Sequence, residues 1–234
     1  MTVAAVILYR DPAGALADAA GRPSVRRAVE SAWAGGATPI VVVSLDPDGG
    51  VASALAGSPA VLAEPAPVEN GPVAQMVRGM AVAAEQVTET EAALIWPGRM
   101  VWVDAETVTS LIEAYGARRG SVLRPTYNGE EGWPVLVPST SATALAALGG
   151  DKMPDVLIAE LMAASTTAMV ETGDPGITHD ASTAMESLPE YLGPPQPVGG
   201  HAPEWGAAAA EMPDDAPLEG PALAPYAQAA EEGD

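Results

Sequence analysis

The stretch Val3-Ala4-Ala5-Val6-Ile7-Leu8 opens the chain with a continuous apolar run, and Pro39-Ile40-Val41-Val42-Val43-Ser44 is a second run of the same kind. Runs of this length that are rich in β-branched residues are typical of strands buried on both faces of a sheet. Between them, Pro23 begins a stretch with apolar residues at helical spacing, which ends at Gly35-Gly36. Strand, helix and strand in this order predict a crossover unit with parallel strands.

The same alternation continues to residue 170. We expect further strands at 60–63, 92–96, 121–124, 134–137 and 167–170, and helices at 23–34, 51–57, 72–86, 105–116, 139–148 and 154–164. The pattern predicts an α/β fold of three layers, with helices on both faces of a mainly parallel sheet. Ligands in such folds bind beyond the carboxyl ends of the strands, so the loops after Leu8, Trp96 and Val170 are the expected place for a site.

The composition excludes several classes of function. The chain of 234 residues has 31 acidic and 10 basic side chains, a net charge of −21, and Lys152 as its single lysine. This balance argues against binding to nucleic acids or to anionic membranes. The absence of cysteine excludes disulfides and thiolate chemistry. No apolar run spans a bilayer and no signal peptide is recognisable, so we expect a cytoplasmic protein.

The acidity has two open explanations: a proteome that avoids lysine or is adapted to salt, or an acidic surface for a basic partner. The composition also divides the chain. Residues 1–190 carry the strand and helix pattern, whereas residues 191–234 hold eight prolines, six glycines, eight acids and no lysine or arginine. We expect a disordered acidic tail there, either a passive solubilising segment or one that folds onto a partner or its own domain. A protein partner or a homo-oligomer, through the domain surface or the tail, is expected.

Several stretches between residues 3 and 188 follow the order and spacing of known motifs. They are 4–8 (Ala-Ala-Val-Ile-Leu), 21–23 (Gly-Arg-Pro), 36–37 (Gly-Ala) before 41–43 (Val-Val-Val), 71–80, 98–100 (Gly-Arg-Met), 124–127 (Arg-Pro-Thr-Tyr) before 132–136, 150–152 (Gly-Asp-Lys) and 174–180 (Asp-Pro-Gly-Ile-Thr-His-Asp). Together they resemble the MobA-like NTP transferases, which include the cytidylyl- and guanylyltransferases of the molybdenum cofactor. The resemblance implies a Rossmann-like, GT-A-like nucleotidyltransferase fold.

The same resemblance supplies the candidate site residues. By family position, the nucleotide-binding candidates are Leu8, Arg10, Gly71, Gln75 and Arg99, and the metal-binding candidate is Asp180. Gln75 stands where the family has a helix serine that faces the nucleotide. No residue is singled out as catalytic, because the chain has no Gly-x-Ser-x-Gly elbow, no P-loop and no Gly-x-Gly-x-x-Gly motif.

The chain departs from the family at the positions that hold phosphate and metal. Active members have a Gly-Gly pair and a lysine in the loop after the first strand, where backbone N–H groups and cations hold the triphosphate. Here residues 8–20 contain neither, and Arg10 is their single cation. The family's Mg²⁺-binding aspartate corresponds to Arg99, which cannot ligate a metal. Arg99 either contacts a phosphate in place of the metal or pairs with a carboxylate.

The last motif is also incomplete. Asp180 is retained, but Ser182 replaces the second aspartate of the family motif. Asp180 is therefore either a weak metal ligand or the N-cap of a helix over the following residues. His179 beside it fits a turn residue better than a ligand.

Two main functions remain open, and a third, an acidic structural module of an oligomeric shell or enzyme, differs from the first of them only in its partner. The first is a catalytically degenerate relative with no cofactor, which acts in binding, assembly or scaffolding beside a molybdenum enzyme or within a larger complex. The second is an active nucleotidyltransferase that uses Mg²⁺, takes CTP or GTP with molybdopterin and releases pyrophosphate. The second would need substitute cations from Arg10, Arg22, Arg78 and Arg99, so scattered arginines and a filled space below Leu8 would count against it.

Overall fold

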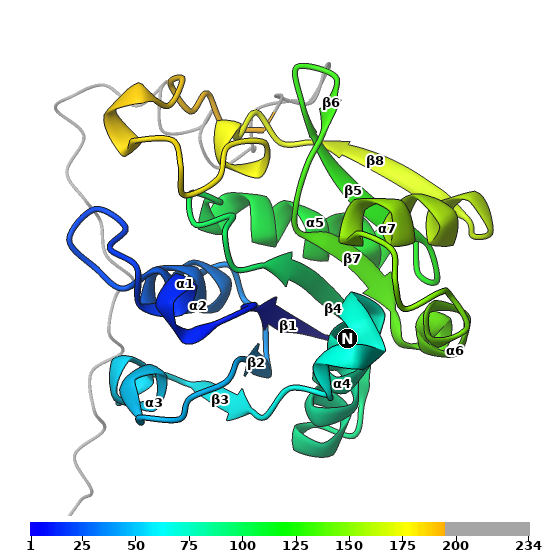
Figure 1. Ribbon diagram of the computed structural model, residues 1–234. Coiled ribbons are helices and arrows are strands. Elements are labelled where there is room, and N and C mark those ends of the chain that lie inside the picture. Colours follow the sequence, from blue (N-terminus) through cyan, green and yellow to red (C-terminus); the bar gives the residue numbers. More distant parts are fainter. Residues whose placement is uncertain (195–234) are drawn as a thin grey trace, which may run out of the picture. The chain divides into compact units, whose positions relative to one another are not determined.

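The computed structural model describes residues 1–194, which form a single eight-stranded sheet with helices on both faces (Figure 1). The strands are β1 (Thr2–Leu8), β2 (Ile40–Val43), β3 (Ala60–Ala63), β4 (Thr90–Pro97), β5 (Val122–Tyr127), β6 (Glu130–Glu131), β7 (Val135–Pro138) and β8 (Thr167–Glu171). Their order is β3-β2-β1-β4-β7-β5-β6, and β8 pairs with β5. The pairs β1–β2, β2–β3, β1–β4 and β5–β8 are parallel, while β7 is antiparallel to β4 and β5.

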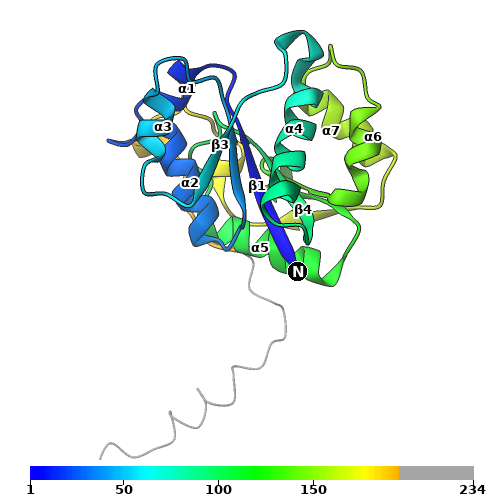
Figure 2. The same ribbon diagram turned by 90° about the horizontal axis from the view of Figure 1, so that it is seen from below.

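The helices cover the sheet in two layers. They are α1 (Pro12–Leu16), α2 (Ser24–Ala34), α3 (Gly50–Leu55), α4 (Gly71–Gln86), α5 (Ala105–Ala117), α6 (Ala142–Ala146) and α7 (Pro154–Ala163). Figure 2 shows α1, α2 and α3 on one side of the sheet and α4, α6 and α7 on the other, and α5 packs beside α2. The predicted three-layer α/β fold with a mainly parallel sheet is thereby confirmed.

The core is centred on β1, which lies between β2 and β4. Val6 pairs with Val41 on one side and with Ile95 on the other, and all three are buried. Helix α4 lies directly on this centre, because a Cβ added at Gly79 would lie 2.1 Å from a methyl carbon of Val6. The glycine therefore permits the close approach of α4 to the strands that carry the candidate site.

Three local features differ from the expectations. The loop expected after β1 contains the five-residue helix α1, which Asp11 caps by accepting a hydrogen bond from the Gly14 N–H at 2.8 Å. The segment 139–148 is a 3-10 turn at Ser139–Ser141 followed by the short helix α6, rather than one helix. Glu130 and Glu131, which lie outside the predicted strands, pair with the end of β5 as β6. Helices and strands this short leave too few residues for a periodic signal.

Most of the predicted tail, 191–234, lies outside the described residues, and so does the prediction that it is disordered. Residues 191–194 belong to the described part, where the Tyr191 hydroxyl donates to Glu106 Oε2 at 3.0 Å. Within residues 1–194, every helix is too short or too polar to cross a bilayer.

Candidate nucleotide-binding site

An aromatic side chain at the start of the loop after β1 packs against the loop after β4. The Gly98 N–H, which follows β4, donates to the Leu8 carbonyl at 2.8 Å. Tyr9 comes next and is buried, and a Cβ added at Gly98 would lie 2.3 Å from its ring. The Tyr9 hydroxyl lies 2.8 Å from Ser24 Oγ, which donates to the Gly98 carbonyl at 3.3 Å. The Tyr9 ring therefore packs against Gly98, where the loops after β1 and β4 begin.

Burial also changes the acidity of Tyr9. Burial raises the pKa of the phenol well above its ordinary value, and the hydrogen bond with Ser24 offsets only part of this increase. The hydroxyl is thus neutral at any physiological pH and serves as a hydrogen-bonding group. The Tyr9–Ser24–Gly98 contacts join β1, α2 and the loop after β4 at the edge where a nucleotide was expected.

The candidate cations have different partners. Arg10 is exposed and forms no ion pair with any residue of 1–194. Arg22 pairs with Glu30, and Arg78 Nε donates to the Glu64 carbonyl at 3.4 Å. Arg99 lies on the loop after β4 and pairs with carboxylates. Three of the four arginines are thus held by separate groups of the protein itself.

The two candidates on α4 have structural contacts. The Gln75 side chain donates to the Ala66 carbonyl at 2.8 Å and accepts from the Ala66 N–H at 2.9 Å, which ties the segment after β3 to the helix. Gly71 has a positive φ of 71°, and a Cβ there would lie 1.5 Å from the Gly150 carbonyl oxygen. Gln75 therefore holds the segment at Ala66 against α4, and Gly71 allows the backbone at Gly150 to come close.

Arg99 and Asp180 are brought together at the carboxyl edge of the sheet. Arg99 Nε lies 3.8 Å from Asp180 Oδ2, and Arg99 Nη2 lies 3.8 Å from Asp155 Oδ2. The chain itself joins them, because the Ala181 N–H donates to the Arg99 carbonyl at 2.8 Å. Of the two interpretations of Arg99, the ion pair with carboxylates describes this geometry.

Asp180 is held by its own turn as well. It accepts hydrogen bonds from the Ser182 N–H at 2.9 Å and the Ser182 hydroxyl at 2.6 Å. These two bonds, followed by the charges of Arg99 and His179, lower the pKa of Asp180 below its ordinary value. The interpretation of Asp180 as a helix N-cap is wrong: a 3-10 turn at Met185–Ser187 follows, and Ala184 precedes it. The aspartate closes a local turn instead.

Arg124 is the residue of this site that the sequence did not single out. Its side chain is only 9% exposed, and it pairs with Glu131 at 2.7 Å and with Asp155 at 3.6 Å. The Trp133 indole N–H donates to Asp155 Oδ1 at 3.0 Å, and the Arg124 guanidinium lies 5.9 Å from the centre of that indole. Arg124 ends the predicted strand 121–124, and a charge that follows two buried apolar residues was the available signal, because it needs a partner.

The carboxylates that pair with Arg99 and Arg124 line a polar pocket of about 250 Å³. Its walls are Arg99, Met100, Glu130, Glu131, Trp133, Asp155, Ile177, Thr178 and Asp180. A divalent cation does not fit this set, because the Arg99 guanidinium already lies beside two of the carboxylates that would ligate the ion. Within residues 1–194, no three acidic or histidine side chains converge as a metal site.

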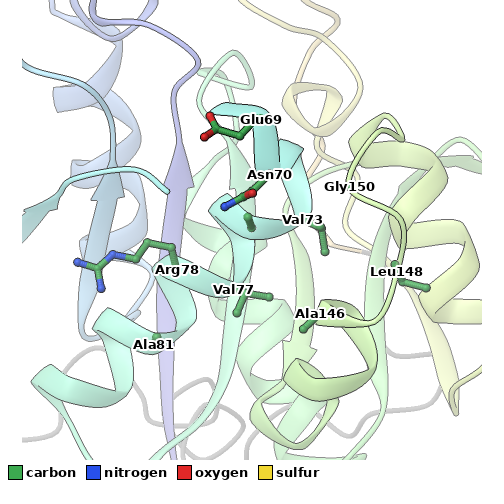
Figure 3. Close-up of a pocket in the computed structure, with 10 residues that line it drawn as sticks. Glu69, Asn70, Val73, Val77, Arg78, Ala81, Ala146, Leu148 and Gly150 are labelled. Atoms are coloured by element: carbon green, nitrogen blue, oxygen red, sulfur yellow. The ribbon is translucent and has the colours of Figure 1, made fainter. Parts of the chain in front are cut away.

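A larger groove of about 600 Å³ lies between α4 and α6 (Figure 3). Its walls are mostly small apolar side chains of α4 and of the segment 146–150, with Glu69, Asn70 and Arg78 at the margin. Neither Gly71 nor Gln75 lines it, although Arg78, one of the candidate cations, does.

The fold and the motif positions define an α/β domain of the nucleotidyltransferase type. The family described as MobA-like NTP transferase domain matches residues 14–166, more than half of the chain. The chain therefore belongs to this family. No curated protein sequence matches the chain significantly.

Solved structures of nucleotidyltransferases share the fold. Rv0371c of Mycobacterium tuberculosis H37Rv superposes with a TM-score of 0.59 at 18% identity, over 73% of this chain and 87% of its own. A nucleotidyl transferase from Methanothermobacter gives 0.57 at 17% identity, over 73% and 87%. The 4-diphosphocytidyl-2C-methyl-D-erythritol synthase of Anaerococcus prevotii gives 0.61 at 11% identity, over 79% and 92%. At these identities the likeness concerns the fold.

Proposed function

We propose that this protein is a catalytically degenerate member of the MobA-like NTP transferases, which keeps the fold and acts in binding, assembly or scaffolding. The observation that carries the proposal is Arg99, at the family's metal position, in contact with Asp155 and Asp180. A guanidinium neutralises the carboxylates that a metal would use, and it cannot bridge two phosphates as Mg²⁺ does. The guanidinium of Arg99 thus takes the place of the catalytic Mg²⁺.

The loop after β1 supports the same proposal. Triphosphate binding needs backbone N–H groups that a phosphate can approach closely. Here the Tyr9 ring packs against Gly98, and the Leu8 carbonyl and Gly98 N–H are bonded to each other. Two independent changes, at the phosphate loop and at the metal position, each remove stabilisation of the transition-state charge, and each such loss is typically about 3 kcal/mol.

The test is turnover and nucleotide binding by the full chain. We expect no pyrophosphate release from CTP or GTP with molybdopterin, and no heat of nucleotide binding that depends on Mg²⁺ in calorimetry. Mg²⁺-dependent pyrophosphate release by the pure protein would falsify the proposal and favour the active nucleotidyltransferase. In that case Arg99→Ala should lower turnover, since Arg99 would then act on phosphate.

The link to molybdenum enzymes is part of the same proposal and has its own test. The protein should co-purify with a molybdenum enzyme or its maturation factors from the native host. If affinity purification under gentle conditions recovers no such protein, the assembly role belongs to another system, even where turnover is absent.

A further inference from the structure

Among residues 1–194, strand β8 (Thr167–Glu171) is an edge of the sheet, and Figure 1 shows it at the outside beyond β5. Its pairing with β5 is parallel, with Val122 beside Thr167 and Thr126 beside Glu171. The Val122 N–H donates to the Thr166 carbonyl, and the Thr172 N–H donates to the Thr126 carbonyl. The even-numbered residues of this segment therefore direct their backbone groups to β5.

The odd-numbered residues direct theirs away from the sheet. Thr167, Met169 and Glu171 point both N–H and C=O outward, and their side chains are exposed. Such an edge is a template for a further strand unless charged side chains, proline or a bulge block it. The sequence Thr-Ala-Met-Val-Glu has no proline or lysine, and its pairing shows no register shift. Its one charge, Glu171, lies at the end of the strand and accepts a hydrogen bond from the Thr126 hydroxyl at 2.9 Å. The opposite edge strand β3 differs, because its four residues are all buried or half-buried.

We propose that β8 pairs with β8 of a second copy of this chain, antiparallel and about a two-fold axis at Met169. The two sheets then form one continuous sheet across the dimer. In this register Met169 faces Met169 of the second copy, and Thr167 faces Glu171 of the second copy. Each outward-facing pair exchanges both N–H···O bonds. The interface is isologous, as a closed two-fold dimer requires.

Charge favours this arrangement over the alternatives. A parallel pairing of two identical strands would bring both Glu171 side chains to the same end, where like charges repel. The antiparallel register separates them and directs each Glu171 toward the amino end of the partner strand. Arg118 lies in the turn before β5 at that end of the sheet, since its carbonyl accepts from the Ser121 N–H. Arg118 is exposed and pairs with no carboxylate among residues 1–194.

The chain offers a matched pair of positions for the test. Met169 and Met185 are both 46% exposed, and Met185 lies in the 3-10 turn after Asp180 rather than on the sheet edge. Met169→Lys places two like charges opposite each other on the axis, whereas Met185→Lys adds the same charge elsewhere. The variants are compared in the full chain by sedimentation equilibrium and light scattering. Circular dichroism of each variant shows that it is folded.

The natural protein should sediment at twice its 23.6 kDa mass. Met169→Lys should raise the dissociation constant of the dimer about tenfold or more, and Met185→Lys should leave it unchanged. Thr167→Lys should tighten the dimer, because the lysine then faces Glu171 of the second copy. Because the chain has no cysteine, Met169→Cys should form a reducible disulfide dimer on mild oxidation, and Met185→Cys should not.

Three outcomes would overturn the proposal: a monomer at concentrations up to about 0.1 mM, a dimer that Met169→Lys does not weaken, or equal cross-linking of the two cysteine variants. Binding of another protein or of the chain's own C-terminal segment along β8 would give the first of these outcomes. Oligomeric state and turnover are measured separately, so this proposal and the proposed loss of catalysis stand or fall independently.

Discussion

The Arg99 guanidinium lies 3.8 Å from the Asp180 carboxylate, although the two residues are 81 positions apart in the chain. Asp155 lies at the same distance on another side of the arginine. Arg99→Asp should convert this arrangement into three neighbouring carboxylates, a donor set that hard divalent cations prefer. We expect the variant to bind Mn²⁺ at least about tenfold more tightly than the natural protein in calorimetry. Arg119→Asp is the control, because Arg119 also pairs with a carboxylate, Glu91. Equal Mn²⁺ affinity in both variants would show that Arg99 does not occupy a cation position.

Tyr9 should contribute to stability through its ring more than through its hydroxyl. Tyr9→Phe removes one buried hydrogen bond to Ser24 and should lower the free energy of unfolding by about 1 kcal/mol. Tyr9→Ala also leaves a cavity beside Gly98, and the loss should reach about 4 kcal/mol. Urea unfolding measures both. Tyr127→Phe, at a half-buried position, is the control and should change stability by less than about 0.5 kcal/mol.

Gly71 should be intolerant of any side chain for a packing reason. Gly71 and Gly120 both have positive φ, 71° and 82°, but only Gly71 would place a Cβ against backbone, 1.5 Å from the Gly150 oxygen. Gly120→Ala should cost only the conformational strain, about 1–2 kcal/mol. Gly71→Ala should cost about 2 kcal/mol more than that, because the segment at Gly150 must move. Similar losses of unfolding free energy for the two variants would contradict this account.

Removal of the Asp174 carboxylate should destabilise the fold. Asp174 is buried and accepts from the Asp104 N–H, the Thr107 hydroxyl and the Gly176 N–H at 2.7–2.9 Å. Asp174→Ala leaves these donors without a partner and should lower the free energy of unfolding by about 3 kcal/mol. The exposed Asp151→Ala is the control and should have little effect. A loss below about 1 kcal/mol for Asp174→Ala would mean that water replaces the carboxylate.

Asp174 and Asp180 should titrate on opposite sides of the ordinary aspartate pKa. Burial raises the pKa of Asp174, while hydrogen bonds from Ser182, with the charges of Arg99 and His179, lower the pKa of Asp180. The lowered pKa of Asp180 stabilises the fold above the ordinary aspartate range, and this contribution is lost as the pH falls through its folded-state value. The raised pKa of Asp174 acts in the opposite direction. Its contribution to stability is present below the ordinary aspartate range and is lost as the pH rises through the folded-state pKa.

Carboxyl chemical shifts in NMR titrations measure both groups. Ser182→Ala removes a hydroxyl donor and should raise the pKa of Asp180 without moving that of Asp174. Ser58→Ala, whose hydroxyl accepts from the Ala60 N–H, is the control. If Asp180 titrates in the ordinary range in the natural protein, Ser182 does not hold its carboxylate in solution.

Much of the fold was predictable, because it depends on local apolar patterns. The runs at 3–8 and 39–44 have the pattern of strands buried on both faces, and β1 and β2 each lie between two other strands and are almost entirely buried. The helix predicted at 105–116 is α5, and Asp104 caps it by accepting a hydrogen bond from the Glu106 N–H. Helix α1 was missed, since a five-residue helix shows no period.

The sequence by itself determined the three-layer α/β architecture, the family resemblance, and the absence of a lysine and a Gly-Gly pair after the first strand, because each is a matter of residue types at short spacing. Only the tertiary structure decided that Arg99 meets Asp155 and Asp180, that Arg124 is buried beside them, and that Tyr9 packs on Gly98. The physical reason is separation along the chain. The contacts between Arg99 and the two aspartates cross 56 to 81 residues, so they depend on how crossover helices return strands to the same sheet edge, and no local pattern encodes that distance.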